Sequence, residues 1–300
     1  MNQMRIAVLG AGAIGGLVGA KLVEAGFDVL IHSRGDHGAM LAISGLKIIG
    51  RWHYQISDKE WVVTIDEAGL HPQLENSCDY AIITSKAKDT QKLAEIAKFI
   101  CTGPVLSLQN GLGNLEILQE VLGPQRCAVG VTTNAVLKVK AGEINWIGKG
   151  ATQVGGRCGE EFSNLLKCLD AEFVEDVELI LWSKLLLNVA INPLAAMCGV
   201  KNGKLLDPEL FEQAESCMFE AANVGRMEGV DLPSDEELSL RLTEVLNATS
   251  ENICSMLQDV REGKITEIEM LCGQVVKRGE RAGVPTPLNA LLLTQIKSIL

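Results

Sequence analysis

The start of the chain combines a short apolar strand, a glycine-rich turn and a helix, and this order restricts the fold more than any other feature. Arg5–Leu9 (RIAVL) has the composition of a buried strand, a helical pattern runs from Ala13 to Ala25, and Phe27–Ile31 predicts a second strand. Between the first strand and the helix stands a G-x-G-x-x-G sequence. The pattern is weak alone, but between a strand and a helix it predicts a βαβ unit that binds a dinucleotide.

Each glycine of this turn has a physical role in dinucleotide binding. Gly10 permits the tight turn, Gly12 lets a pyrophosphate approach the backbone, and Gly15 lets the helix pack closely on the strand. The first turn of the helix then offers free N–H groups to the phosphates. A glycine-rich turn without a ligand is the alternative. The expected cofactor contacts are Gly10, Ala11, Gly12, Ala13, Ile14 and Gly15.

The residues after the second strand indicate which dinucleotide is bound. NAD-binding proteins place a carboxylate there to hold the ribose hydroxyls. This chain has Ser33 and Arg34 instead, and a guanidinium suits a 2′-phosphate. Asp36 competes for the role but follows Gly35, where we expect a loop. An ordinary surface charge is the alternative for Arg34, and the sequence favours NADPH/NADP+ as the cofactor.

Strands and helices alternate through the first part of the chain, whereas only helices are expected after about residue 176. The fold class that this predicts is α/β, with an N-terminal Rossmann-type doubly wound sheet (residues 1–176) followed by an all-α C-terminal domain (residues 177–300). The further elements expected in the first domain are strands at Tyr80–Thr84, Val105–Leu108 and Ala128–Val131, helices at Gln91–Phe99 and Asn114–Val121, short antiparallel strands within residues 134–156, a helix at Glu160–Leu169 and a strand at Glu172–Val177. The helices expected in the second domain are Leu179–Cys198, Pro208–Glu228, Ser234–Ala248, Glu251–Glu262, Glu267–Ala282 and one from Pro287, with Ser234 and Glu237 forming a capping box.

Composition narrows the partners and the compartment. The net charge is −11 and no basic run occurs, so we expect no nucleic-acid partner. Apolar runs are interrupted before they reach membrane-spanning length, and no secretory signal precedes Arg5, so we expect no membrane association. The nine cysteines include no C-x-x-C pair, and the four histidines lie in the first quarter of the chain. We therefore expect no metal site, reduced thiols and a cytoplasmic protein; a homodimer through an exposed helix face of the second domain is compatible with the sequence.

A lysine lies in the middle of an apolar helix. The stretch LILWSKLLLNVAINPLAAMC carries Lys184, Asn188 and Asn192 at spacings of four, so these three side chains form one narrow polar stripe. Burial would lower the pKa of the lysine amine toward neutrality, where it could donate a proton in a reaction. A lysine that reaches to the surface from a core helix is the alternative.

Two further polar groups follow predicted strands, at the edge where parallel sheets bind ligands. Asn110 follows Val105–Leu108, and an Asn-Gly turn is its alternative explanation. Lys86 follows Tyr80–Thr84, and Lys88 is close enough that spacing does not separate the two lysines.

With these motifs in place, the chain resembles the ketopantoate reductase (2-dehydropantoate 2-reductase) family over essentially its whole length. The resemblance is carried by the segments GAGAIG, TSKAKDT, LQNGLGN, WSKLLLNVAINPLAA and ENICSMLQDVREGKITEIEMLCG, of which the last two are long and specific. It implies NADPH-dependent reduction of 2-dehydropantoate to (R)-pantoate, in the route to pantothenate and coenzyme A.

The resemblance also implies roles for single residues. Lys184 would be the general acid, with Glu267 as its catalytic carboxylate and a neighbour of the cofactor. Lys86 and Asn110 would lie near the nicotinamide ribose. The residues expected around the substrate are Asn110, Asn188, Asn192, Asn252 and Ser255.

Simpler structural explanations exist for part of this set. Asn252 and Ser255 lie three residues apart on an expected helix and hence on one face, although a serine at a helix start is more often a cap. Glu267 opens a helix, where an acid normally complements the dipole.

Two other functions are compatible with the same residues. One is a reductase on the same scaffold that acts on a different 2-oxo acid, because pocket shape rather than motif decides the substrate. The other is a non-catalytic NADP-binding sensor, which would retain the glycine turn and Arg34 but would have no need for Lys184 and Glu267.

Overall fold

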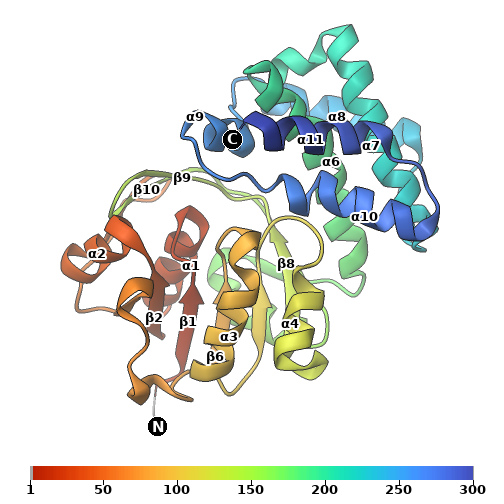
Figure 1. Ribbon diagram of the computed structural model, residues 1–300. Helices are drawn as coiled ribbons and strands as arrows, with labels where there is room; N and C mark the ends of the chain where they lie inside the picture. Colours follow the sequence, from red (N-terminus) through yellow and green to blue (C-terminus); the bar gives the residue numbers. More distant parts are fainter. Residues whose placement is uncertain (1–2, 300) are drawn as a thin grey trace. The chain divides into compact units, whose positions relative to one another are not determined.

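The computed structural model describes residues 3–299 and divides the chain into two compact units (Figure 1). Unit 1 comprises Met1–Gln109 and Asn114–Val177, and unit 2 comprises Asn110–Gly113 and Glu178–Leu300. The four-residue segment Asn110–Gly113 thus belongs to unit 2 although unit 1 surrounds it in the sequence. The domain boundary expected from the sequence did not include this excursion.

Unit 1 is built on an eight-stranded sheet in the order β12-β11-β8-β7-β6-β1-β2-β5. All neighbouring strands run parallel except β11, which pairs antiparallel with β8. The parallel-dominated sheet confirms the predicted α/β class. The strands are β1 (Arg5–Leu9), β2 (Asp28–Ser33), β5 (Val62–Ile65), β6 (Tyr80–Ile83), β7 (Val105–Ser107), β8 (Cys127–Thr132), β11 (Thr152–Gly155) and β12 (Ala171–Phe173).

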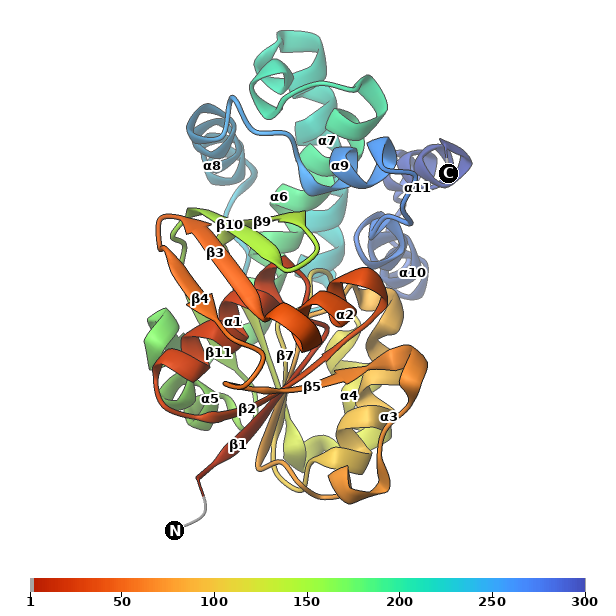
Figure 2. The same ribbon diagram turned by 90° about the vertical axis from the view of Figure 1, so that its left-hand side faces the viewer.

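Helices cover both faces of this sheet, as Figure 2 shows with the sheet seen nearly edge-on. On one face, α1 (Ala13–Glu24) and α5 (Gly159–Leu165) contribute to one buried cluster; on the other, α3 (Thr90–Ile100) and α4 (Asn114–Leu122) contribute to a second. The alternating side chains of the strands supply both clusters: Ile6 and Val8 of β1 belong to the first, Ala7 and Leu9 to the second. The sheet is therefore buried on both faces, as a doubly wound sheet requires.

A second sheet packs against α1 and was not expected as a separate layer. Its order is β4-β3-β10-β9, formed by β3 (Leu46–Gly50), β4 (Tyr54–Ile56), β9 (Ala135–Lys140) and β10 (Glu143–Gly148). A Cβ added at Gly16 of α1 would already lie 3.3 Å from side-chain atoms of Ile144 and Leu46, so the glycine lets this sheet approach the helix. The expected antiparallel pairing of residues 135–148 is confirmed for β9 with β10, whereas β3 joins β10 in parallel.

Residues 35–65 contain more structure than the sequence predicted. Helix α2 (Gly35–Ser44) follows β2 directly, so Asp36 lies in the first turn of a helix and the expectation of a loop there is wrong. The strands β3, β4 and β5 are three to five residues long; β3 pairs with its neighbour β4 and with the distant β10, and β5 joins β2 in the main sheet. Short strands of this kind leave little periodicity to read.

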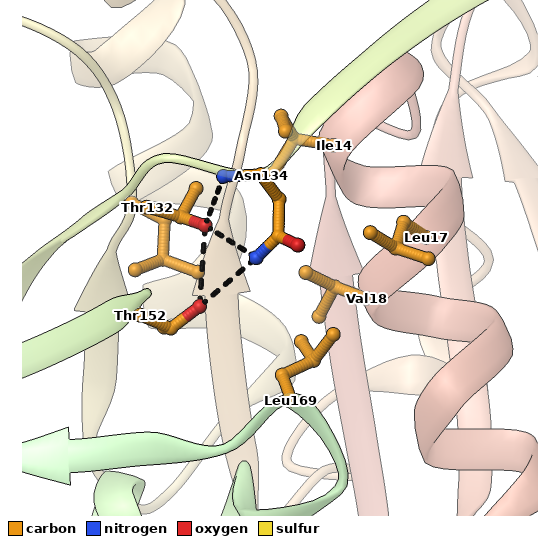
Figure 3. Close-up of a pocket in the computed structure, with 8 residues that line it drawn as sticks. Ile14, Leu17, Val18, Thr132, Asn134, Thr152 and Leu169 are labelled. Atoms are coloured by element: carbon orange, nitrogen blue, oxygen red, sulfur yellow. Dashed lines mark hydrogen bonds between the residues drawn. The ribbon is translucent and has the colours of Figure 1, made fainter. Parts of the chain in front are cut away.

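A polar cluster ties the two sheets of unit 1 together (Figure 3). Thr132 at the end of β8 and Thr152 of β11 share a hydrogen bond of 3.2 Å, and the Asn134 amide donates to Thr132 at 2.9 Å. The Asn134 carbonyl accepts from the indole of Trp146 in β10 at 3.1 Å. The hollow between these groups and Ile14, Leu17 and Val18 of α1 has a volume of about 10 Å³, which is room for one water molecule and too small for a substrate.

In the part that the structure describes, the regular elements of unit 2 are all helices. Its helices are α6 (Val177–Cys198, whose first residue belongs to unit 1), α7 (Pro208–Met227), α8 (Asp235–Ala248), α9 (Ser255–Arg261), α10 (Cys272–Ala282) and α11 (Pro287–Ile299). The capping box at Ser234 and Glu237 is confirmed. Helix α6 is long and apolar enough to cross a membrane on composition, but 61% of its most apolar window is buried inside the protein, which marks it as a core helix.

Three expected helices differ from the observed ones. Glu160–Leu169 divides into α5 and a short 3₁₀ turn, Lys167–Leu169. The helix expected over Glu251–Glu262 begins only at Ser255, because Cys254 occupies the cap position and its Sγ accepts from the N–H of Leu257. The helix expected over Glu267–Ala282 is a 3₁₀ turn, η7 (Ile268–Met270), and then α10, with a break at Leu271.

Candidate active site

The glycine turn of unit 1 has the geometry that each glycine was expected to need. Gly10 has φ +97°, and a Cβ there would lie 2.5 Å from the Cβ of Ser85. A Cβ at Gly15 would collide with the Thr84 hydroxyl and the Gly10 carbonyl, so the helix packs on the strand only without a side chain. A Cβ at Gly12 would meet no protein atom within 4 Å, so the backbone at Gly12 is open to a ligand. Protein atoms therefore leave no room for a side chain at Gly10 and Gly15, whereas the space beside Gly12 could accept a phosphate.

The N-terminus of α1 carries no group that would repel an anion. Gly12 precedes the helix and supplies no side-chain cap, and the first turn contains no acidic residue. The N–H groups of Gly10 and Ala11 donate to the carbonyl of His32, whereas the first-turn N–H groups of an α-helix have no acceptor within the helix. This end of α1 therefore suits a phosphate group.

Arg34 follows β2 directly, as expected, but it has an acidic partner that the sequence did not reveal. Its Nη1 and Nη2 donate to Oδ1 and Oδ2 of Asp89 at 3.2 and 3.0 Å. The next backbone N–H, that of Gly35, donates to Glu67 at 3.0 Å. Asp36 is exposed, whereas the guanidinium of Arg34 forms an ion pair with Asp89.

The structure distinguishes Lys86 from Lys88 by exposure. Lys86 directly precedes the 3₁₀ turn η3 (Ala87–Asp89) with an extended backbone and is half-buried. Lys88 lies inside that turn and is exposed. Of the two lysines that follow β6 at the carboxyl end of the sheet, Lys86 is thus the less exposed.

Lys184 lies in the third turn of α6 among apolar neighbours. Three of its neighbours in the helix are buried, namely Trp182, Leu185 and Leu186. Lys184 itself is half-buried. The crowding of protein atoms around the amine removes water and lowers its pKa from 10.5 to about 8, while the charge of Glu267 acts in the opposite direction. The sequence-based expectation was a lowering of this kind.

Glu267 is held by the amide of Asn110. Asn110 Nδ2 donates to Glu267 Oε2 at 3.0 Å, although 157 residues separate the two in the chain. Glu267 immediately precedes η7, and both residues belong to unit 2. A carboxylate with a fixed orientation thus lies close enough to Lys184 to raise the pKa of its amine.

The segment Asn110–Gly113 reaches Glu267 because it packs against η7. The N–H of Leu112 donates to the carbonyl of Met270 at 3.3 Å. Gly111 has φ +83°, and a Cβ there would collide with the same carbonyl. The Asn-Gly pair, for which a simple turn was the alternative explanation, therefore lies in a loop that packs on η7 and brings the Asn110 side chain to the carboxylate.

The remaining candidate residues occupy unit 2 in two groups. Asn188 and Asn192 follow Lys184 on the uninterrupted helix α6 and are half-buried. Asn252 and Ser255 are exposed. The expectation that they share one helix face is wrong, because Asn252 precedes α9 in an irregular segment and Ser255 is the first residue of the helix. The cap is supplied by Cys254, so Ser255 is not needed as a cap.

Two residues that follow β6 contact the glycine turn and Arg34, and the sequence did not predict either contact. The Thr84 hydroxyl donates to the Gly10 carbonyl at 2.9 Å, and Asp89 pairs with Arg34. A threonine and an aspartate within TSKAKDT gave no local signal for these roles. Among residues 3–299, no group of three His, Cys, Asp or Glu side chains could hold a metal ion, and all nine cysteines are free.

Comparison with known proteins places both units in one family. The family model described as ketopantoate reductase PanE/ApbA matches residues 6–157, and its C-terminal counterpart matches residues 176–299. The 2-dehydropantoate 2-reductase of Archaeoglobus fulgidus is 35% identical over 100% of this chain and 99% of its own length, and that of Pyrococcus horikoshii is 35% identical over 98% and 97%.

Solved structures agree with this result. A PanE/ApbA family ketopantoate reductase from Ralstonia eutropha has a TM-score of 0.88 at 28% identity and covers 99% of this chain and 98% of its own. D-mandelate dehydrogenase with NADH has a TM-score of 0.89 at 20% identity over 99% of this chain and 98% of its own, which shows the shared fold. The glycine turn, the lysine of α6 and the full-length matches lead to one conclusion: this chain belongs to the ketopantoate reductase family of oxidoreductases.

Proposed function

We propose that this chain reduces 2-dehydropantoate to (R)-pantoate with NADPH, in the route to pantothenate and coenzyme A. The observation that carries the proposal is the buried amine of Lys184, with a pKa of about 8, near a carboxylate fixed by Asn110. An amine with this pKa is largely protonated at neutral pH and gives up its proton more readily than an ordinary lysine. The full-length similarity to 2-dehydropantoate 2-reductases supports this substrate.

Unit 1 fits NADPH by observations of the structure itself. The backbone at Gly12 is open where a pyrophosphate would approach, and the first turn of α1 contains no acid. Arg34 would hold the 2′-phosphate, and the six residues Gly10–Gly15 would hold the pyrophosphate. Lys86 and Asn110 would lie near the nicotinamide ribose. When bound, NADPH supplies the hydride that reduces the carbonyl carbon of the substrate.

Lys184 would stabilise the charge that develops on the substrate oxygen and then protonate it. Reduction of a ketone places negative charge on the carbonyl oxygen, and an ammonium in poorly solvated surroundings stabilises that charge strongly. Transfer of a proton from Nζ to this oxygen completes the alcohol. Glu267 would keep the amine protonated between turnovers, because its charge raises the pKa of Lys184.

The polar stripe of α6 and the start of α9 would recognise the rest of the substrate. Asn188 and Asn192 would offer amides along the helix face that carries Lys184, and Asn252 and Ser255 would offer an amide and a hydroxyl to the carboxylate and hydroxyl of the substrate. The cytoplasm is the compartment that we propose, because nine free cysteines, seven of them buried, suit a reducing environment.

The test is the oxidation of NADPH in the presence of 2-dehydropantoate and, separately, of other 2-oxo acids. We expect steady turnover with 2-dehydropantoate and a much lower kcat/KM with the others. Turnover with only another 2-oxo acid would move the chain to a different substrate on the same scaffold. Binding of NADPH without turnover of any acid would favour a sensor.

A further inference from the structure

The cation expected to bind the 2′-phosphate is already engaged by a carboxylate. Arg34 and Asp89 form a bidentate pair in which two guanidinium nitrogens meet two carboxylate oxygens at 3.2 and 3.0 Å. The Arg34 side chain is 55% exposed and that of Asp89 is 18% exposed. The guanidinium is therefore accessible to a phosphate, but the Asp89 carboxylate already binds it.

A carboxylate and a phosphate compete for the same geometry. The planar fork of arginine binds both anions through two parallel N–H donors, so each favours the same edge of the guanidinium. Even if the phosphate used another edge, the charge of Asp89 would repel it across a short distance. The pair contributes little stability on its own, because the Arg34 side chain is more than half exposed to solvent. A phosphate can thus displace Asp89, at some cost in affinity.

The acidic character extends beyond Asp89. Glu67 accepts the N–H of Gly35 at 3.0 Å, directly after Arg34, and would add negative charge at the same end of β2. Asp66, in the same 3₁₀ turn as Glu67, differs because Lys92 binds it at 2.5 Å and lowers the pKa of its carboxyl. Asp89 is the carboxylate that touches Arg34 itself, so its effect on a phosphate should be the largest of the three.

We infer that Asp89 is a specificity-determining residue: it competes with the 2′-phosphate for Arg34 and so reduces the preference for NADPH over NADH. The inference rests on the proposed function through the ligand assigned to Arg34. It predicts that the carboxylate of Asp89 weakens, rather than assists, the binding of NADPH.

The experiment measures dissociation constants of the intact protein for NADPH, NADH and adenosine 2′,5′-bisphosphate by calorimetry. Asp89→Asn keeps the size of the side chain and removes its charge. Asp89 precedes α3 without a side-chain capping bond, so the substitution should leave the fold intact. We expect the Kd for NADPH and for the bisphosphate to fall about threefold to tenfold, and the Kd for NADH to change less than about twofold.

Asp58→Asn is the matched control, since it removes the same charge from an exposed loop residue of unit 1. It should change none of the three constants beyond about 1.5-fold, because distant exposed charges are screened. A Kd for NADPH that is unchanged or higher in Asp89→Asn would overturn the inference, and a higher value would instead identify Asp89 as a residue that orients Arg34.

Arg34→Ala separates this inference from the proposed function. If Arg34→Ala leaves the Kd for NADPH unchanged, the role of Arg34 in the proposed function fails, and the inference fails with it. If Arg34→Ala weakens NADPH binding while Asp89→Asn does not strengthen it, only the inference fails. In the Arg34→Ala background, Asp89→Asn should strengthen NADPH binding less than it does in the parent chain.

Discussion

The glycine turn of unit 1 excludes a side chain at two of its three glycines, whereas in α6 of unit 2 the amine of Lys184 lies where protein atoms exclude water. At Gly10 and Gly15 a single added carbon would meet protein atoms. At Lys184 the surrounding protein atoms remove water, and this lowers the pKa of the amine to about 8. The glycine turn thus depends on the absence of side chains, and the properties of the lysine amine depend on the exclusion of water by the protein around it. Substitutions should therefore act on different quantities in the two units.

The largest effect should follow removal of the amine. Lys184→Ala is expected to lower kcat by about 10²–10⁴, because the developing charge loses its ammonium and its proton donor, while the Kd for NADPH stays within about twofold. Single-turnover kinetics and calorimetry measure the two quantities. Lys277→Ala, at an exposed position of α10, is the control and should leave kcat unchanged. A parallel loss of NADPH affinity in Lys184→Ala would show that the two sites do not act on separate quantities.

Two substitutions in the glycine turn should differ in kind. Gly10→Ala is expected to lower the unfolding free energy by about 2–4 kcal/mol, because φ is +97° and Ser85 occupies the space of a Cβ. Gly12→Ala should cost less than about 1 kcal/mol, since no protein atom lies within 4 Å, yet it should weaken NADPH binding about tenfold or more. Urea denaturation and calorimetry measure both. Equal losses of stability in the two variants would contradict the view that Gly12 is kept bare for the ligand.

The pH dependence of reduction should report the crowding around Lys184. With a pKa of about 8, the amine is protonated below that value and loses its proton above it. We expect kcat/KM for reduction to be level below about pH 8 and then to fall about tenfold per pH unit. Glu267→Gln removes the charge that raises this pKa, so the fall should move to lower pH. A fall that begins only near the pKa of an ordinary lysine would mean that the amine is well solvated.

The smallest effect should be a gain in stability when the amine is replaced by a thioether. A pKa lowered from 10.5 to about 8 corresponds to about 3 kcal/mol, which partial exposure reduces, so Lys184→Met should raise the unfolding free energy by about 1–2 kcal/mol near pH 7. Below about pH 8 both states hold the proton and the folded state bears the full cost. Between about pH 8 and 10.5 the folded lysine releases the proton and the cost disappears. A gain that stays constant from about pH 7 to pH 10 would assign it to packing instead.

The sequence predicted the features that are local and missed those that depend on distant partners. The glycine turn, the strands that flank it and the polar stripe of α6 were predicted because each is contained within a short segment. The contact between Asn110 and Glu267 joins residues 157 apart, and no periodicity within either segment reports it. The ion pair of Arg34 with Asp89 was not predicted either, because it also joins residues that are distant in the chain. The error over Asn252 arose from a capping role of Cys254, a residue type that is rarely preferred at that position.

The second sheet of unit 1 has a consequence for how the protein is made. β3 pairs in parallel with β10, so Ile48 lies beside Ile144, and the partner strand leaves the ribosome long after β3 does. Until then Leu46 can pack against α1, but Ile48 lacks the neighbouring strand that lies beside it in the finished protein. A nascent chain that ends before residue 135 would leave the edge of β3 without its partner β10, and unpaired strand edges favour aggregation. The second sheet is therefore completed late in synthesis, and the β3–β4 hairpin is the part of unit 1 through which we expect incomplete chains to associate.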